Sequence, residues 1–367
     1  MQKLFALIVL LVFFPMHGHL QQKNNFAVIA YYAGKNTSQI DSFPIEKLSH
    51  IIFSFCHLKE NRLQVDSTRD SVMIEKMVSL KKRNPDLKVI LSLGGWGGCA
   101  GCSDAFSTKA GRKEFARSVK ELSDYFGSDG IDLDWEYPTI QGYPNHKYQV
   151  ADRENFTALV KELRRTLGSK YEISFAAGGF DYYIDNSVEW KKVMKKVNYV
   201  NLMTYDLVNG YATQTGHHTA LFSTEQQTES IDNAVQKLLR LKIPRNKIVI
   251  GAAFYGRMWE AVPDTNYGLY QQGKFVKSVS YKSFSSQLSE DSGYVYHWDE
   301  KAMAPYLFNS TQHLFVTYDD KRSIQLKTKY AMDKRLGGIM FWQLTSDAYS
   351  EGLLDAIDEA KLNYLKQ

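Results

Sequence analysis

Apolar residues fall into short runs that alternate with longer stretches of helical spacing. Eight runs have the length of a buried strand: Phe26–Tyr31, His50–Phe55, Lys88–Leu93, Gly130–Trp135, Ile173–Ala177, Tyr199–Met203, Lys247–Phe254 and Gly338–Trp342. Other stretches place apolar residues at i, i+3 and i+4, and this spacing predicts helices over Met73–Arg83, Arg112–Phe126, Arg153–Leu167, Val188–Lys196, Ser230–Leu241, Ser323–Arg335 and Leu353–Tyr364.

Eight alternations of strand and helix predict an α/β fold whose parallel strands close into a (β/α)8 TIM barrel. A doubly wound open sheet is the alternative, although it rarely needs eight such units. In a barrel, the functional side chains lie at the C-terminal ends of the strands.

The segment 258–317, between the seventh and eighth strands, interrupts this rhythm. It loses helical periodicity and is rich in Tyr, Ser and Lys. About sixty residues are too many for a plain loop in a compact domain. We therefore expect a small, largely β subdomain on the functional face, inserted into a barrel formed by residues 21–257 and 318–367.

The N-terminus combines an early Lys3 with an uncharged apolar run from Leu4 to Phe14. Such a run is typical of a signal peptide and too short to span a membrane, which takes about 20 apolar residues. We predict that residues 1–20 are a signal peptide cleaved near 18–20. No later segment has the length and hydropathy of a membrane span, so we expect a secreted protein, extracellular or periplasmic.

Composition narrows the function classes. Hydrophobic residues make up 44% of the chain and charged residues 23%, which is ordinary for a globular protein and excludes wholesale disorder. The formal net charge of +5 is scattered over predicted helix faces, so we expect no nucleic-acid partner. We also expect a monomer. Aromatic residues reach 13%, an excess that fits either core packing or a stacking surface.

The three cysteines are too few to staple a fold of this size. Cys99 and Cys102 lie in a glycine-rich loop as C-x-x-C, for which a local disulfide is the first interpretation in an exported protein and a redox dithiol the second. A structural zinc site needs about four ligands, and no second pair exists. We expect Cys56 to be buried and free, and we expect no metal and no cofactor.

The stretch Asp129–Pro138 carries the most specific chemistry. Side chains alternate along a strand, so Asp132, Asp134 and Glu136 face the barrel interior if their neighbours face the helices. Crowded carboxyl groups in a low dielectric raise one another's pKa, and this prepares one of them to act as a general acid. The alternatives are an exposed amphipathic strand and a divalent metal site with a phosphate substrate.

This stretch and several others resemble the motifs of glycoside hydrolase family 18, the chitinases and their relatives. DGIDLDWEYP over Asp129–Pro138 is similar to the family signature D-x-x-D-x-D-x-E. Ser92–Trp96 resembles the S-x-G-G motif of the third strand, Met203–Asp206 the M-x-Y-D motif of the sixth, and Tyr255–Arg257 the Y-G-R end of the seventh. Gly338–Trp342 resembles the eighth strand, and the insertion occupies the place of the family's α+β domain.

The resemblance implies a secreted chitinase with substrate-assisted retaining catalysis. Glu136 would protonate the glycosidic oxygen and later activate water, while the substrate's own 2-acetamido oxygen attacks the anomeric carbon. Asp134 would orient the acetamido group, and Asp132 would hydrogen-bond Asp134 and share a proton with it. Tyr205 would donate its hydroxyl to the acetamido oxygen. The substrate would be chitin or chito-oligosaccharides.

Further sugar contacts are implied at strand ends. Trp342 would stack under the sugar as the floor of the site. The other expected contacts are Tyr31, Phe55, Trp96, Met203, Asp206 and Arg257. The chain departs from many chitinases at Gly34, where they carry a Trp at the entry of the cleft, and in the loop Gly97–Cys102.

Three other functions stay open at this point. An endo-β-N-acetylglucosaminidase acting on N-glycans shares the acidic motif. A chitinase-like lectin uses the same barrel only to bind sugar, although such proteins usually lack the acid that Glu136 supplies. A metal-dependent barrel hydrolase is the third, and His217 and His218 would need a third ligand that the sequence does not identify.

Overall fold

The structure is a computed structural model that describes residues 26–366. The predicted signal peptide, residues 1–20, lies outside the described residues. Among residues 26–366, no helix combines the length and the hydropathy that crossing a membrane requires.

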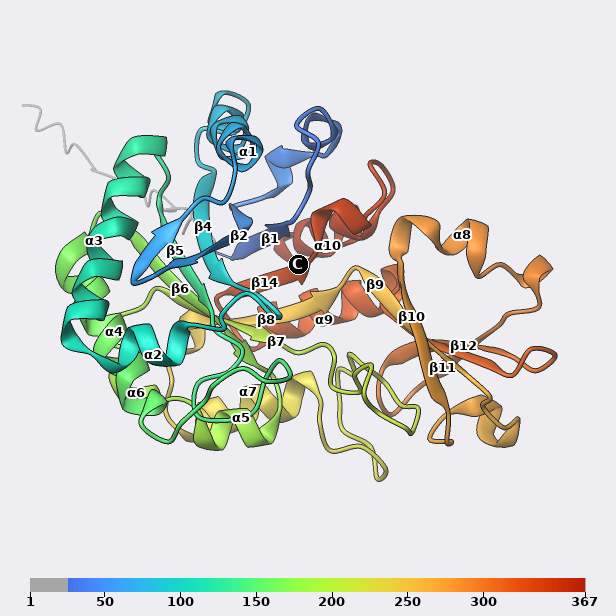
Figure 1. Ribbon diagram of the computed structural model, residues 1–367. Helices are drawn as coiled ribbons and strands as arrows, with labels where there is room; N and C mark the ends of the chain where they lie inside the picture. Colours follow the sequence, from blue (N-terminus) through green and yellow to red (C-terminus); the bar gives the residue numbers. More distant parts are fainter. Residues whose placement is uncertain (1–25, 367) are drawn as a thin grey trace, which may run out of the picture.

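Eight parallel strands form a closed barrel, as predicted (Figure 1). The strands are β1 (Ala27–Tyr32), β2 (His50–Lys59), β4 (Lys88–Gly94), β5 (Gly130–Asp134), β6 (Glu172–Gly178), β7 (Tyr199–Met203), β8 (Ile248–Ala253) and β14 (Gly338–Trp342). β1 pairs in parallel with both β2 and β14, which closes the sheet. Their residues are largely buried on both faces, which explains why the strands appear in the sequence as continuous apolar runs.

Helices cover the outside of the barrel (Figure 1). They are α1 (Thr68–Ser79), α2 (Cys102–Ser107), α3 (Lys109–Phe126), α4 (Asp152–Leu167), α5 (Asp181–Asn186), α6 (Trp190–Val193), α7 (Ile231–Arg240), α9 (Lys321–Asp333) and α10 (Leu353–Leu365). Ser67, Thr108 and Ser230 begin α1, α3 and α7 by accepting a backbone N–H of the first turn, the usual role of an N-cap.

Two local expectations were wrong. The helix predicted over Val188–Lys196 is a single turn, because burial of Val188, Trp190, Val193 and Met194 reproduces helical periodicity without a long helix. β2 continues past Phe55 and turns back to pair with β3 (Arg62–Gln64), a hairpin that the apolar pattern does not indicate.

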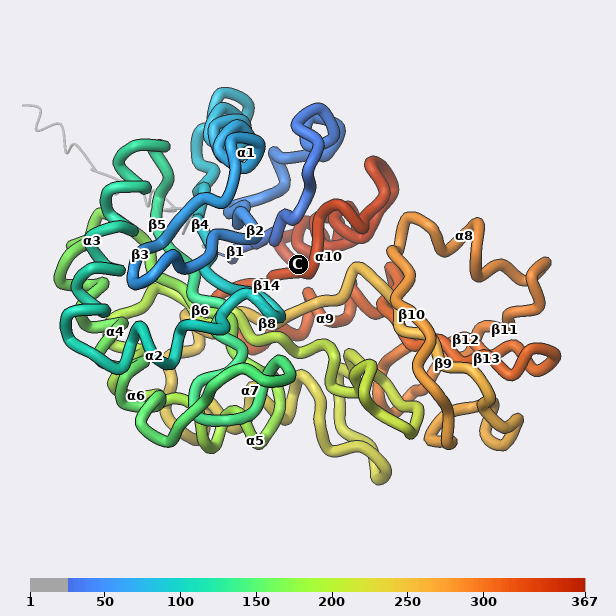
Figure 2. The backbone as a smooth tube through the Cα atoms, in the orientation of Figure 1, coloured from blue at the N-terminus to red at the C-terminus, as the bar shows by residue number. Residues whose placement is uncertain are grey.

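A second sheet lies beside the barrel, formed by the chain between β8 and β14 (Figure 2). Its strands are β9 (Tyr255–Glu260), β10 (Lys274–Ser280), β11 (Val295–Asp299), β12 (Ala304–Asn309) and β13 (Leu314–Thr317), in the antiparallel order β10-β9-β13-β12-β11, with the short helix α8 (Phe284–Gln287). Tyr255–Arg257 therefore begins this sheet rather than ending the seventh barrel strand. The division of the chain at residues 258 and 317 stays a prediction.

The apolar core lies mainly between barrel and helices. Ile131, Leu133 and Trp135 of the β5 segment join this outer cluster, as their alternation predicts. A smaller cluster fills the barrel interior, among it Tyr31, Met203 and Met340. The acidic positions of β5 therefore face the interior, where little solvent reaches them.

Phe175 on β6 is a suitable residue for testing how much the outer core contributes to stability. It is fully buried, and its ring lies 5.3 Å from that of Phe156 and 6.0 Å from that of Trp190. Phe175→Ala should lower the free energy of unfolding by about 3–5 kcal/mol, because it leaves a cavity in a packed region. Tyr125→Ala, at a ring that is 76% exposed, is the control and should cost less than about 1 kcal/mol in the same urea titration. Equal losses would contradict this description of the core.

Candidate active site

Asp132 lies at the centre of a hydrogen-bond network inside the barrel. Its Oδ2 accepts from the hydroxyls of Tyr31 at 3.1 Å and Ser92 at 2.9 Å. Its Oδ1 accepts from Ser174 at 2.6 Å and from the Asn201 amide at 3.2 Å. Burial raises the pKa of Asp132, and these donors offset part of the rise. Four strands thus hold one carboxyl group in place.

Asp134 is the next interior residue of β5. It is 4% exposed, and its Oδ1 has no hydrogen-bond partner among the described residues. Burial, followed by the charges of Glu136 and Asp132, raises the pKa of Asp134 well above its ordinary value. The resemblance implied a hydrogen bond from Asp132 to Asp134. Donors on neighbouring strands contact both oxygens of Asp132, and the proton shared between Asp132 and Asp134 stays a prediction.

Glu136 follows the end of β5, where the chain leaves the barrel, and is partly accessible. Burial of its carboxyl group raises the pKa of Glu136 to about 7, and the charge of Asp206 adds to the rise while a hydrogen bond from Tyr137 opposes it. A carboxyl group with this pKa is partly protonated at neutral pH. It can therefore deliver a proton to a bound substrate.

Tyr205 follows the end of β7 and points into the interior cluster beside Met203 and Met340. Its hydroxyl lies 3.8 Å from the sulfur of Met340, a weak contact. Burial, then the charges of the nearby carboxylates, raises the pKa of Tyr205 well above its ordinary value. The hydroxyl therefore keeps its proton and can donate it in a hydrogen bond.

Asp206, Arg257 and Tyr255 join the barrel to the second sheet. The guanidinium of Arg257 contacts both carboxylate oxygens of Asp206, and the Tyr255 hydroxyl donates to Oδ1 at 2.7 Å. Burial alone would raise the pKa of Asp206, but the His218 ring, with Nδ1 3.5 Å from Oδ1, and the hydrogen bonds from Arg257 bring it below its ordinary value. Asp206 therefore stays ionised and fixed in position. Tyr255 belongs to this cluster, although the sequence singled it out only as part of a motif.

Trp342, the last residue of β14, lies among other aromatic side chains. Its ring stacks on Phe55, with centroids 5.6 Å apart and planes at 14°, and lies 6.0 Å from the ring of Tyr31. Tyr31 is 2% exposed, so it supports Trp342 and Asp132 from below rather than offering a surface of its own. Trp342 and Phe55 are the partly exposed members.

Trp96 lies in the loop after β4. It is 47% exposed, and its ring lies 5.7 Å from that of Tyr143, 6.3 Å from Tyr211 and 6.4 Å from Tyr137. Tyr143 and Tyr211 come from the loops after β5 and β7. Sequence reasoning missed both, because only general Tyr richness pointed to them.

The loop that carries Trp96 continues into a disulfide between Cys99 and Cys102, whose Cα atoms are 5.2 Å apart. Cys56 is buried and free, as predicted, and burial raises the pKa of its thiol. His217 contacts Asp299 rather than His218, with 3.0 Å between Nε2 and Oδ2. Within residues 26–366, no cluster of three His, Cys, Asp or Glu residues could hold a metal ion.

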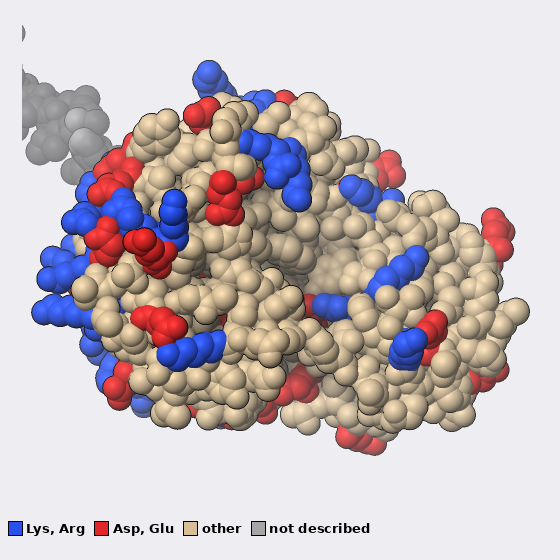
Figure 3. Space-filling view, in the orientation of Figure 1, with Lys and Arg blue, Asp and Glu red and all other residues tan. Residues whose placement is uncertain are grey.

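The surface is hollowed between the barrel and the second sheet (Figure 3). The walls of this hollow are mostly uncharged, whereas Lys, Arg, Asp and Glu gather over the outside of the barrel. A barrel with protonatable carboxyl groups and an aromatic floor at its strand ends is the arrangement of a barrel enzyme that uses acid–base catalysis.

Comparison with known proteins gives the family. The family model described as "Glycosyl hydrolases family 18" matches residues 27–347. Chitinase A1 of Niallia circulans is 33% identical over 298 residues, which are 75% of this chain and 42% of that protein. Chitinase B of Serratia marcescens is 29% identical over 396 residues, covering 88% of this chain and 77% of the relative. The chain belongs to glycoside hydrolase family 18 and is a glycoside hydrolase.

Solved structures agree with this assignment. A family 18 N-acetylglucosaminidase from Paenibacillus barengoltzii is 36% identical, with a TM-score of 0.83, and the match covers 91% of this chain and 99% of that one. The Group IV chitinase of Ostrinia furnacalis, in complex with allosamidin, is 26% identical, with a TM-score of 0.84 and coverage of 92% and 99%.

The shifted pKa of Glu136 can be measured without a substrate. Potentiometric titration of the wild type and Glu136→Gln should show that the wild type releases more protons between pH 6 and 8, because its carboxyl group titrates near 7. Glu162→Gln is the control, since Arg165 lowers the pKa of Glu162 and its loss should leave this range unchanged. Identical curves for wild type and Glu136→Gln in that range would contradict the assignment.

Proposed function

We propose that this protein hydrolyses β-1,4-linked N-acetylglucosamine polymers and oligomers, chitin and chito-oligosaccharides, by substrate-assisted retaining catalysis. The observation that carries the proposal is the pair of neighbouring carboxyl groups with different surroundings. Glu136 is partly accessible with a pKa of about 7, and Asp134 is buried with a free Oδ1. The family is one in which the substrate supplies the nucleophile.

In this mechanism Glu136 donates its proton to the glycosidic oxygen as the bond to the anomeric carbon breaks. The carbonyl oxygen of the 2-acetamido group attacks that carbon and forms a cyclic oxazolinium ion. Glu136, now a carboxylate, takes a proton from the water that opens the ring, so the product keeps the configuration of the substrate. The same residue thus acts first as acid and then as base.

Asp134 and Tyr205 would bind the acetamido group during this step. The free Oδ1 of Asp134 can accept the acetamido N–H, and the Tyr205 hydroxyl can donate to the acetamido oxygen. The Asp134 contact acts on the positive charge that develops on the acetamido group in the transition state, and the Tyr205 contact orients that group. A sugar without the acetamido group would lack the nucleophile and both contacts.

The surroundings favour a neutral sugar chain. Trp342 and Phe55 offer an aromatic face at the strand ends, and sugar rings present apolar faces that pack on aromatic side chains. We propose Trp96 as a further contact on the leaving-group side, and Met203, Asp206 and Arg257 as contacts around the reacting sugar. The mostly uncharged walls of the hollow fit a substrate without anionic groups.

A second candidate is removal of single N-acetylglucosamine units from chain ends. It is favoured by the likeness to the Paenibacillus barengoltzii N-acetylglucosaminidase, at 36% identity over nearly all of that chain. The two candidates share the catalytic residues and differ in how many sugars bind on either side of them.

Other parts of the proposal rest on sequence. We propose that residues 1–20 are a signal peptide that directs export, and that residues 258–317 form a subdomain inserted into the barrel. A monomer without nucleic-acid partners also remains our expectation.

Product analysis on N-acetylglucosamine tetramers to hexamers tests the proposal. From the hexamer, the wild type should first release dimers, trimers and tetramers if it is a chitinase, and monomers together with the pentamer if it is an N-acetylglucosaminidase. Glu136→Gln should lower kcat at least about 100-fold while the protein stays folded, because it removes the general acid. Glu162→Gln is the control and should match the wild type. A protein that ignores these oligomers but trims high-mannose glycopeptides would overturn the substrate assignment.

A further inference from the structure

Lys327 is a buried charge that the proposed mechanism does not use. It lies on α9, is fully buried, and places its Nζ 2.5 Å from Oδ1 of Asp319, which is 1% exposed. Burial lowers the pKa of Lys327, and the charge of Asp319 opposes this effect. Burying two charges costs stability that apolar residues of the same size would not cost. Stability alone therefore does not explain the pair.

Asp319 connects the pair to the end of a barrel strand. Its Oδ2 accepts from the backbone N–H of Ala253, the last residue of β8, at 3.0 Å. Its Oδ1 also accepts from the Ser323 hydroxyl at 2.7 Å. The first turn of α9 and the C-terminal end of β8 are thus held together by one carboxylate.

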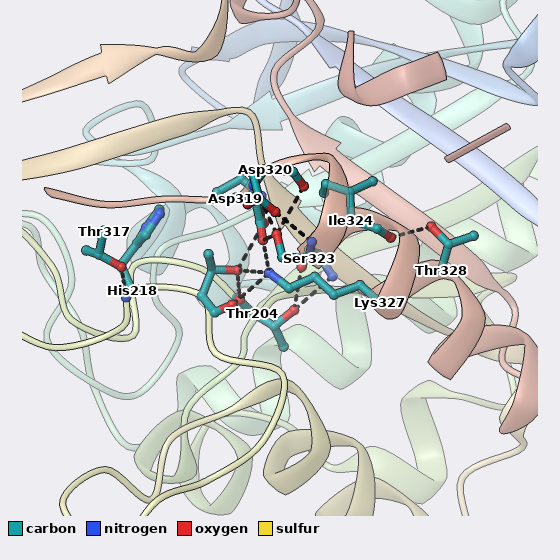
Figure 4. Close-up of polar contacts among 12 residues, drawn as sticks. Thr204, His218, Thr317, Asp319, Asp320, Ser323, Ile324, Lys327 and Thr328 are labelled. Atoms are coloured by element: carbon teal, nitrogen blue, oxygen red, sulfur yellow. Dashed lines mark hydrogen bonds and ion pairs between the residues drawn. The ribbon is translucent and has the colours of Figure 1, made fainter. Parts of the chain in front are cut away.

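Lys327 connects the same pair to the segment that follows β7, where Thr204 lies (Figure 4). Its Nζ donates to both the carbonyl oxygen and Oγ1 of Thr219, each at 2.7 Å. The Thr219 hydroxyl in turn donates to the carbonyl oxygen of Thr204 at 3.0 Å. Thr204 also uses its own hydroxyl to bridge to Gly251 on β8, as donor to the carbonyl and acceptor from the N–H, both at 2.9 Å.

The Thr204 carbonyl belongs to the peptide bond that leads into Tyr205. β7 ends at Met203, so Thr204 and Tyr205 lie beyond the strand and need other bonds to fix them. The chain of hydrogen bonds from Lys327 through Thr219 supplies one at that peptide bond. Such chains polarise each bond in turn and hold their members more firmly than isolated bonds do.

We propose that the buried Asp319–Lys327 pair positions Tyr205 for catalysis, acting through Thr219 and the Thr204 carbonyl. The inference rests on the proposed function, in which Tyr205 contacts the acetamido group. Neither charged group reaches the substrate, so both are positioning residues. A displacement of about 1 Å at a catalytic contact can cost about 100-fold in rate. Loss of the hydrogen-bond chain that positions Tyr205 should therefore have a measurable effect on kcat.

Thr219→Val is the sharpest test, because it removes the linking hydroxyl and keeps the shape of the side chain. Lys327→Met is less suitable, since it leaves the Asp319 carboxylate buried without its counter-ion and destabilises the fold. Thr219→Val should lower kcat at least about tenfold with KM close to the wild-type value, and Thr219→Ser should restore kcat.

Thr328→Val is the matched control. Thr328 neighbours Lys327 on α9 and is fully buried, but its hydroxyl donates only to the Ile324 carbonyl of its own helix, at 2.8 Å. Thr328→Val should keep the wild-type kcat, although its melting temperature should change by about as much as that of Thr219→Val. An equal loss of kcat in both Val variants, or none in Thr219→Val, would overturn the proposal.

A double-mutant cycle assigns the effect to Tyr205. In a Tyr205→Phe background, Thr219→Val should cause little further loss of kcat, whereas additive losses would overturn the proposal. A wild type that cleaves no N-acetylglucosamine oligomer would overturn the proposed function instead. Crystal structures of the wild type and Thr219→Val test the positioning of Tyr205 without any substrate. The Tyr205 ring should be displaced in Thr219→Val, and an unchanged ring position would refute the proposal.

Discussion

Burial of carboxyl groups inside a closed parallel barrel is the constraint on which the rest of this structure depends. Alternation along β5 sends Asp132 and Asp134 inward, and the chain exit places Glu136 at the rim. Water is scarce there, so each carboxyl group must be hydrogen-bonded, protonated or paired. The three residues show three outcomes: Asp132 is satisfied by four donors, Asp134 keeps a free oxygen, and Glu136 titrates near neutral pH.

Fixing the neighbouring strand ends is the second requirement, because the residues that face the substrate lie beyond the ladder of backbone hydrogen bonds. Two ion pairs, formed by residues of two different elements, fix the segments that follow the strands. Arg257 of the second sheet holds Asp206, and Lys327 of α9 holds Asp319. The second sheet therefore borders the hollow and also fixes Asp206, which follows β7.

The fold was largely predictable because barrel strands are buried on both faces and stand out as apolar runs. The polar residues within those runs, Ser92, Ser174 and Asn201, were a further signal, since each had to satisfy a buried partner, and that partner is Asp132. Contacts made by loops were not predictable. The approach of Tyr211 to Trp96 depends on how two loops fold over the strand ends, which no periodicity encodes.

The most direct test of the central claim, that a buried acid works with a nucleophile supplied by the substrate, is the configuration of the first product. Proton NMR can follow the anomeric signals while the enzyme cleaves an N-acetylglucosamine hexamer, before the new reducing ends mutarotate. With a nucleophile supplied by the substrate, the β anomer should appear first, because two inversions at the anomeric carbon restore its configuration. Initial release of the α anomer would mean that water attacks directly, and would contradict catalysis by the acetamido group.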